Sequence, residues 1–96
     1  MKTLADLIRI LKENRTELET RFHVKRIGIF GSYARSEETD SSDVDILVEL
    51  SQPIGLNLVD LIYFLEEKIG ERVDLVTVKS LRSEFEEAIL KEVVYT

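Results

Sequence analysis

The sequence predicts a small α/β domain, an α+β two-layer arrangement in which helices pack on one face of a mixed β-sheet. Its 96 residues are 44% hydrophobic, which suits one buried core but leaves little room for a second. Amphipathic helical segments alternate along the chain with short β-prone runs, and two packed layers bury the apolar sides of both. We therefore expect residues 1–96 to form a single domain.

The first element is predicted to be an amphipathic helix from about Thr3 to Glu19. Its apolar residues fall on one stripe at helical spacing: Leu4, Leu7, Ile8, Leu11 and Leu18. Thr3 with Asp6 three residues later is close to a capping box, which satisfies the free N–H groups at a helix start. A helix with this start and this stripe is expected to pack on the sheet.

Two strands follow, separated by a turn and a loop. Val24 to Phe30 is β-prone and stops at a Gly-Ser pair, after which we expect a helical turn over Tyr33 to Ser36. Residues 37–42 are all polar or charged and predict a loop. The clearest strand runs from Asp43 to Leu50, where Val44, Ile46, Val48 and Leu50 alternate with the other residues.

The rest of the chain predicts a helix, a strand and a last helix. Leu56 to Ile69 is helical in pattern and is followed by Gly70, a residue typical of the position just past a helix. Arg72 to Val78 predicts a strand. Ser80 is placed to cap a final helix that runs to about Glu92, and the last four residues form a tail.

The helix expected over residues 56–69 is apolar on more than one side. Leu58, Ile62, Leu65 and Ile69 make one stripe, and Leu61, Tyr63 and Phe64 widen it. Burial on two sides explains such a helix. A docking surface for a partner helix or a second copy of the chain is the alternative, so a homo-oligomer stays open.

Composition limits both the partners and the chemistry. The 13 Lys and Arg stand against 19 Asp and Glu, and the net charge of -6 argues against a nucleic-acid partner, because phosphates attract a basic face. Charges interrupt the apolar runs near the N-terminus, so we predict no membrane span and a cytoplasmic protein. With no Cys and only His23, the available chemistry is that of carboxylates, hydroxyls, guanidinium groups and amines.

Asp43 and Asp45 form the first candidate site. Residues i and i+2 of a strand point to the same face, so two carboxylates lie side by side there. Asp is depleted in strands and like charges repel, so such a pair indicates a cation between them. Oxygen ligands suit Mg²⁺, which keeps waters and adds phosphate oxygens. The alternative is that Asp43 only caps the start of the strand.

Asp74 lies in a second apolar strand and needs a partner or a metal. If this strand neighbours the strand that carries Asp43 and Asp45, three carboxylates converge and can hold two metal ions for displacement at phosphorus. An ordinary ion pair with Arg72 or Lys79 is the alternative for Asp74.

Gly31 and Ser32 supply a turn that suits a phosphate. The pair lies between a strand and a helical turn, where backbone N–H groups attract anions. Gly31 lets the backbone approach a ligand closely, and Ser32 adds a hydroxyl. Arg35 lies three residues further on and can reach the same anion or stabilise the loop.

These residues together carry a family resemblance. Gly31-Ser32-Tyr33-Ala34-Arg35, followed by Ser42-Asp43-Val44-Asp45-Ile46-Leu47, resembles the signature of the DNA polymerase beta-like nucleotidyltransferase superfamily. The size of the chain and its ending, Ile89-Leu90-Lys91-Glu92-Val93-Val94-Tyr95, resemble the minimal nucleotidyltransferases, the MntA-type antitoxins that are paired with HEPN-domain toxins. The resemblance spans nearly the whole chain. One departure is Ser36, where the family often has Gly.

The resemblance implies the nucleotidyltransferase fold and a Mg²⁺-dependent transfer of AMP from ATP to a hydroxyl, in MntA-type members a tyrosine of the HEPN toxin. It implies that Gly31 and Ser32, with Arg35, hold the triphosphate. It also implies that Asp43, Asp45 and Asp74 are the catalytic, metal-binding carboxylates, two Mg²⁺ ions being expected, and that Asp74 helps to deprotonate the acceptor. The alternative from another class is a non-catalytic antitoxin module that neutralises its partner by contact, through residues such as Leu61 or Phe64.

Overall fold

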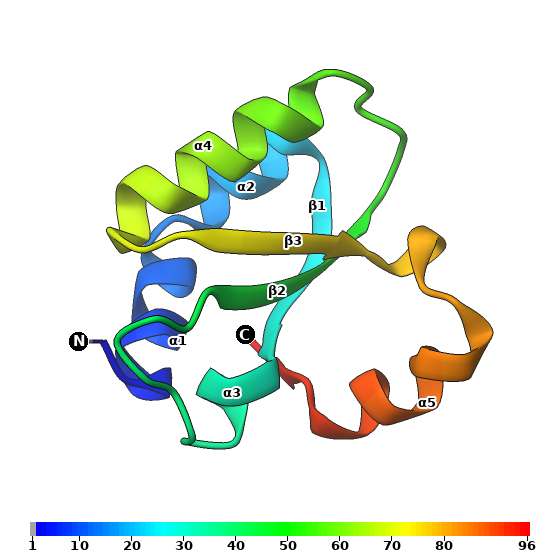
Figure 1. Ribbon diagram of the computed structural model, residues 1–96. Coiled ribbons are helices and arrows are strands. Elements are labelled where there is room, and N and C mark those ends of the chain that lie inside the picture. The colour runs from blue at the N-terminus through cyan, green and yellow to red at the C-terminus, as the bar shows by residue number, and fades with distance from the viewer. Residues whose placement is uncertain (1) are drawn as a thin grey trace.

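A four-stranded mixed β-sheet forms the centre of the protein (Figure 1), seen in a computed structural model that describes residues 2–96. The strand order is β3-β2-β1-β4. The strands are β1 (Val24–Phe30), β2 (Val44–Leu50), β3 (Val73–Thr77) and β4 (Val94–Tyr95). β1 runs antiparallel to both of its neighbours, β2 and β4, and β3 runs parallel to β2. The sheet is therefore mixed, as predicted.

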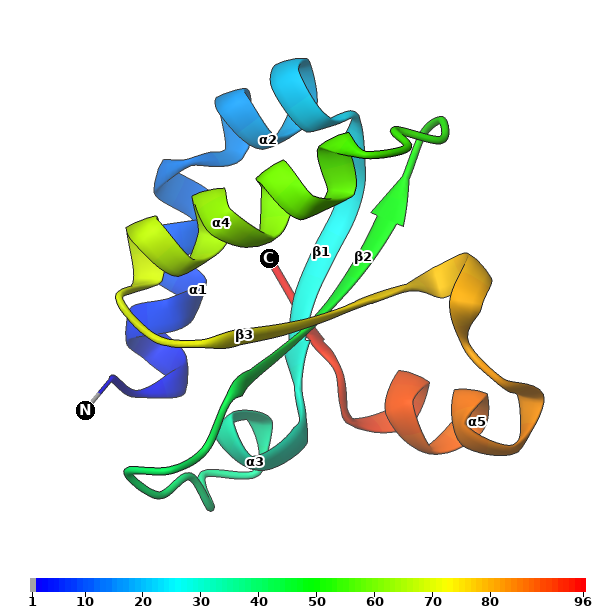
Figure 2. The same cartoon turned by 45° about the horizontal axis from the view of Figure 1, so that its top comes forward.

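Helices cover the sheet unequally. The helices are α1 (Leu4–Glu13), α2 (Arg15–Phe22), α3 (Gly31–Ala34), α4 (Asn57–Ile69) and α5 (Ser83–Glu92), with a 3₁₀ turn, η1 (Val78–Ser80), after β3. α1, α2 and α4 lie on one side of the sheet and α5 on the other (Figure 2). The core lies between the first three helices and the sheet, and α5 contributes no buried residue to it. The predicted α/β fold class is confirmed, but the expectation that the helices all pack on one face fails for α5.

The predicted single helix from Thr3 to Glu19 is wrong, because the chain forms two helices that break at Asn14. The Asn14 side chain donates to the carbonyl of Ile10 at 2.8 Å, and its backbone N–H reaches the same carbonyl at 3.2 Å. The backbone bond is an ordinary helical one, but the side-chain bond competes with it for the Ile10 carbonyl, and such local bonds favour a break in a helix. The predicted capping box of Thr3 and Asp6 is present.

The C-terminal elements differ from the prediction in two places. Ser80 does not cap α5; it ends η1, where its hydroxyl donates to the carbonyl of Thr77, and α5 begins three residues later at Ser83. The expected tail contains a strand, β4, which pairs with the middle of β1. The side chain of Arg26 lies over the Tyr95 ring at 3.9 Å and covers this added strand.

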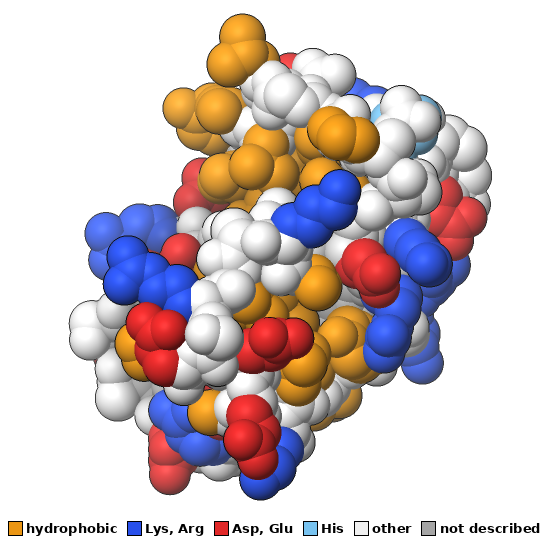
Figure 3. Space-filling view, turned by 90° about the vertical axis from the view of Figure 1, so that its right-hand side faces the viewer, with side chains coloured by type: hydrophobic (Ala, Val, Ile, Leu, Met, Phe, Trp, Pro, Cys, Tyr) orange, Lys and Arg blue, Asp and Glu red, His pale blue; other side chains and the backbone are white. Residues whose placement is uncertain are grey.

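Most of the wide apolar surface of α4 is buried against the rest of the protein. Leu61 is fully buried and Phe64 is 7% exposed, so the alternative that these two residues dock a partner is wrong. Gly70 ends α4 in the left-handed conformation, as predicted. Tyr63 is exposed on the same helix, and α5 also exposes hydrophobic residues. Figure 3 shows that hydrophobic side chains gather in several places on the surface that faces right in Figure 1. Within residues 2–96, the helices are too short or too polar to cross a bilayer.

Candidate functional site

Strand pairing places Asp45 and Asp74 opposite each other. β2 and β3 run parallel, and in their register Asp45 is the partner of Asp74. Paired residues of neighbouring strands project from the same face, so the two carboxylates are adjacent. α4 makes this pairing possible, because parallel strands need a long crossover and a helix commonly supplies it. The adjacency on which the three-carboxylate prediction depended is therefore present.

The site faces away from the helices that cover the core. Val44, Ile46 and Val48 of β2 are fully buried beneath α1, α2 and α4. Asp45 points to the opposite face, where it is half-buried, and Asp74 beside it is exposed. The alternation of the strand thus keeps Asp45 out of the core beneath the helices, although Leu47 on its own face is buried too. The charged pair therefore lies on the sheet, between β2 and the edge strand β3, without entering the core.

Electrostatic repulsion is concentrated on Asp45. Burial and the neighbouring charges of Asp74 and Asp43 raise the pKa of Asp45 from 3.8 to about 6, with a smaller contribution from a hydrogen bond with Asp74. Arg35 acts in the opposite direction but does not cancel this rise in pKa. The site therefore holds more negative charge than its own cations neutralise, which is the condition that attracts a metal ion.

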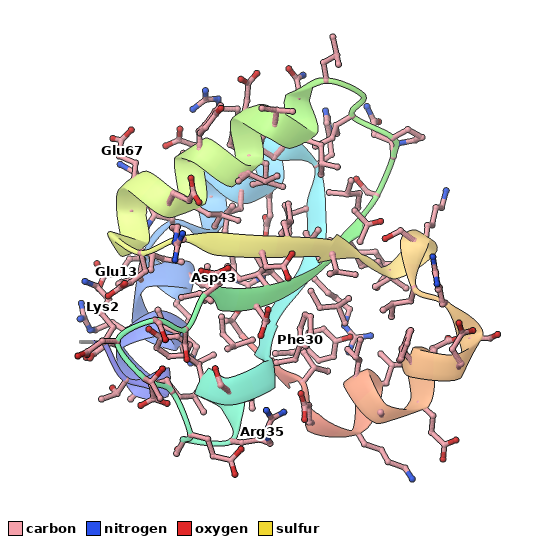
Figure 4. The ribbon with its side chains drawn as sticks, viewed as in Figure 1. Lys2, Glu13, Phe30, Arg35, Asp43 and Glu67 are labelled. Atoms are coloured by element: carbon pink, nitrogen blue, oxygen red, sulfur yellow. The ribbon has the colours of Figure 1, made fainter. Side chains whose placement is uncertain are left out.

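Asp43 is close to this pair but its side chain is held elsewhere. It precedes β2 (Figure 4) and pairs with Arg72, whose Nε lies 3.3 Å from Asp43 Oδ1. Arg72, a predicted alternative partner of Asp74, is therefore engaged by Asp43, and the ion pairs within residues 2–96 include none to Asp74. Two of the three predicted carboxylates meet, and no ready group of three metal-ligating side chains exists in the described part of the chain.

Gly31 lies against the Asp45 carboxylate. Phe30, the last residue of β1, pairs with Asp45 in the antiparallel register, so the chain turns into α3 beside the acidic pair. Gly31 has φ of +73°, and a Cβ at this position would collide with Asp45 Oδ2. Only glycine meets both conditions without strain. The predicted phosphate-binding turn and the predicted metal-binding strand are thus in direct contact.

Arg35 belongs to the same site, and so does a residue that the sequence did not indicate. Arg35 points into the space between α3 and the end of α5 (Figure 4). Its Nη1 donates to both carboxylate oxygens of Glu92, at 3.2 Å and 3.0 Å, and its Nε donates to Glu37 at 2.7 Å. Glu92 also accepts from the backbone N–H of Gly31 at 2.7 Å. Glu92 lies within the C-terminal run that carries the family resemblance, but that run assigns no role to any single residue, so sequence reasoning did not place Glu92 at the site.

Comparisons with known proteins agree on one family. The family described as "Nucleotidyltransferase domain" matches residues 9–96. The protein adenylyltransferase MntA of Thermococcus cleftensis is 46% identical over 96 residues, which cover 99% of this chain and 97% of that protein. A solved structure named as that of a candidate minimal nucleotidyltransferase has a TM-score of 0.80 at 33% identity and covers 97% of this chain and 95% of the other.

A more distant likeness concerns the fold alone. A chain in the complex of a tri-AMPylated HEPN toxin of Shewanella oneidensis with an MNT antitoxin has a TM-score of 0.60 at 22% identity. The match covers 88% of this chain and 68% of that chain.

Proposed function

The chain belongs to the nucleotidyltransferase domain family, and we propose that it is a Mg²⁺-dependent protein adenylyltransferase that moves AMP from ATP to a hydroxyl of a partner protein. The likeness to MntA of T. cleftensis, over nearly the full length of both proteins, supports this reaction class. The proposed acceptor is a tyrosine of a HEPN-type toxin, so the protein acts as an antitoxin. The partner class is taken from the fold neighbour in which an MNT antitoxin accompanies an AMPylated HEPN toxin.

One observation carries the proposal: the paired carboxylates of Asp45 and Asp74 lie beside the glycine turn at Gly31. A nucleotidyl transfer needs an acidic site for cations and, next to it, a site for the phosphates of the nucleotide. Here the two sites share a van der Waals contact. If Asp74 served only to form a structural ion pair, a cationic side chain would be expected beside it, and the ion pair that Arg72 makes is with Asp43.

The acidic side chains fit a divalent cation. Asp45 and Asp74 offer adjacent oxygen ligands. The pKa of Asp45 is raised by burial and by the charges of Asp74 and Asp43, and a cation would relieve the repulsion between these charges. Asp43 would join them when its side chain leaves Arg72. The Arg72 side chain is 80% exposed, so breaking this ion pair costs little free energy. When bound, Mg²⁺ neutralises phosphate charge and activates the acceptor oxygen.

Gly31, Ser32 and Arg35 are proposed to hold the triphosphate. The Gly31 N–H and the Arg35 guanidinium are donors that lie together, as their shared partner Glu92 demonstrates. The hydroxyl of Ser32, the next residue, adds a third donor. The chain's contribution to catalysis is then placement of the nucleotide against the acidic pair, which converts a bimolecular encounter into an oriented one.

The transfer itself is a displacement at the α-phosphorus. The acceptor oxygen forms a bond to this phosphorus, the bond to the oxygen that bridges to the β-phosphate breaks, and pyrophosphate leaves with that oxygen. The proton of the acceptor hydroxyl passes to a carboxylate. We assign this role to Asp74, because it is exposed and can meet an incoming protein, whereas Asp45 is half-buried.

Intact-mass spectrometry of a HEPN-type partner, incubated with the protein, Mg²⁺ and ATP, tests the proposal. We expect the partner to gain one or more AMP groups, and peptide mapping to locate them on tyrosine. Asp43→Asn should abolish the gain. Asp60→Asn removes the same charge from the exposed first turn of α4 and should leave the gain unchanged.

Two results would contradict the proposal in different ways. A stable complex without any mass gain would favour a module that acts by contact alone. Full transfer by Asp43→Asn would exclude the assignment of Asp43 to the metal while leaving the reaction in place.

A further inference from the structure

The side chain of Glu92 occupies the donors that are proposed to bind the nucleotide. It extends from the last residue of α5 to a turn 61 residues earlier in the chain, where its Oε1 accepts from the Gly31 N–H at 2.7 Å. Both of its carboxylate oxygens accept from Arg35 Nη1, at 3.2 Å and 3.0 Å. The side chain is 28% exposed, so this contact is partly shielded from water.

A carboxylate and a phosphate make the same demand on these groups, because both are anionic oxygen acceptors. The Gly31 N–H has a single hydrogen, which points to Glu92 in the present arrangement. A polyphosphate that takes this hydrogen must displace Glu92. A bound polyphosphate that leaves Glu92 in place would instead meet a like charge at hydrogen-bond range, in a site that already holds the paired carboxylates of Asp45 and Asp74.

The way in which Glu92 is held suggests that a ligand can displace its side chain from the Gly31 N–H and Arg35. α5 buries none of its residues, and its hydrogen bonds to Gly31 and Arg35 come from its last residue, Glu92. Arg35 does not depend on Glu92 for its position, because its Nε is held separately by Glu37 at 2.7 Å. Glu92 can therefore move away while Arg35 and Gly31 stay where a phosphate would need them.

We propose that Glu92 is an internal competitor of the substrate, an anion that satisfies the Gly31 N–H and Arg35 until a nucleoside polyphosphate displaces it, and that it thereby sets the affinity for nucleotide. This inference rests on the proposed function, since it assumes that a polyphosphate binds at Gly31 and Arg35. A role in positioning the turn would have the opposite consequence, because removal of Glu92 would then weaken binding.

Glu92→Gln separates the two roles. We expect this variant to bind a non-hydrolysable ATP analogue about tenfold more tightly in calorimetric titration, because one like charge is gone and the remaining amide oxygen is a weaker acceptor than a carboxylate. Without nucleotide its melting temperature should fall by a few degrees, because the Arg35 ion pair is lost. AMP, which lacks the outer phosphates, should gain less affinity than the ATP analogue. Glu84→Gln, in the first turn of the same helix, changes the net charge equally and should change neither quantity.

Each result decides between named alternatives. Equal or weaker binding of the ATP analogue by Glu92→Gln, with normal binding by the wild-type protein, would overturn the competitor role and leave the proposed function intact. Equal tightening by Glu84→Gln would reduce the effect to net charge and would also overturn the competitor role. Absence of binding by both the wild-type protein and Glu92→Gln at millimolar analogue with Mg²⁺ would overturn both proposals.

Discussion

The two faces of β2, a strand of seven residues, have different roles: one packs against the helices and the other carries an acidic residue of the candidate site. On the helical side, Val44, Ile46 and Val48 are all fully buried. On the other side, Leu47 is also buried, and burial together with the charges of Asp74 and Asp43 raises the pKa of Asp45 to about 6. One face lowers the free energy of the folded state by burying apolar area, and the other raises it by holding like charges together.

The difference shows how a small protein can hold a charged site without losing its fold. Residues one step apart on a strand project in opposite directions, so the acidic pair needs no room in the core. Repulsion at Asp45 lowers the free energy of unfolding, and the buried residues on the opposite face of the same strand offset this loss. Substitutions on the two faces should therefore separate activity from stability, and the four predictions below test that separation.

The largest effect is expected from Asp45→Asn on the acidic face. Transfer activity should fall on the order of 10³-fold, the scale seen when one preorganised electrostatic group is removed from a site. The free energy of unfolding should stay the same or rise, because a repelled charge is lost. Rates from partner mass spectrometry and urea titrations measure the two quantities. A variant that both unfolds easily and loses activity would show that the two faces are not separable.

Ile46→Ala, one residue further along, should give the reverse pattern. Removing this fully buried side chain leaves a cavity and should lower the free energy of unfolding by about 2–5 kcal/mol. The folded fraction should keep its transfer rate at low temperature. Urea unfolding followed by circular dichroism, with activity normalised to folded protein, checks both. A small stability change would mean that the core relaxes around the cavity.

Gly31→Ala tests the contact between the turn and the acidic face. We expect a loss of stability above the roughly 1–2 kcal/mol of a left-handed non-glycine residue, because the new Cβ also collides with Asp45. Gly55→Ala is the matched control, since Gly55 has φ of +57° and open space around its Cβ position. The difference between the two variants in urea titration measures the collision. Equal losses would show that Asp45 simply moves aside.

The smallest effect is a pH dependence carried by Asp45. Its pKa is about 6 in the folded protein and 3.8 ordinarily, so between these values the folded state holds a proton that the unfolded state has lost. Its contribution to stability is therefore fully present at low pH and is lost as pH rises through this window. Melting temperatures from pH 4 to 7 without metal should fall by a few degrees relative to Asp45→Asn. Added Mg²⁺ should reduce the difference, and parallel curves for the two proteins would exclude the assigned pKa.

Local patterns in the sequence were sufficient for most elements of the fold. The alternation over residues 43–50, the apolar run of α4 and the glycine after it each predicted the right element within a residue or two. The break at Asn14 and the start of α5 were predicted wrongly. Both depend on which of several short-range hydrogen bonds a polar side chain makes, and a pattern of apolar residues does not record that choice.

The sequence by itself therefore determined most of the helices and strands, the segregation of Asp45 from the core, and the residue types at the site. The tertiary structure decided which of these residues meet: Asp45 with Asp74 through the parallel register, Asp43 with Arg72, and Gly31 with Glu92. The physical reason is range. Periodicity and capping act over a few neighbouring residues, whereas these contacts join residues 29 to 61 positions apart and exist only because the strands pair and α5 returns to the sheet.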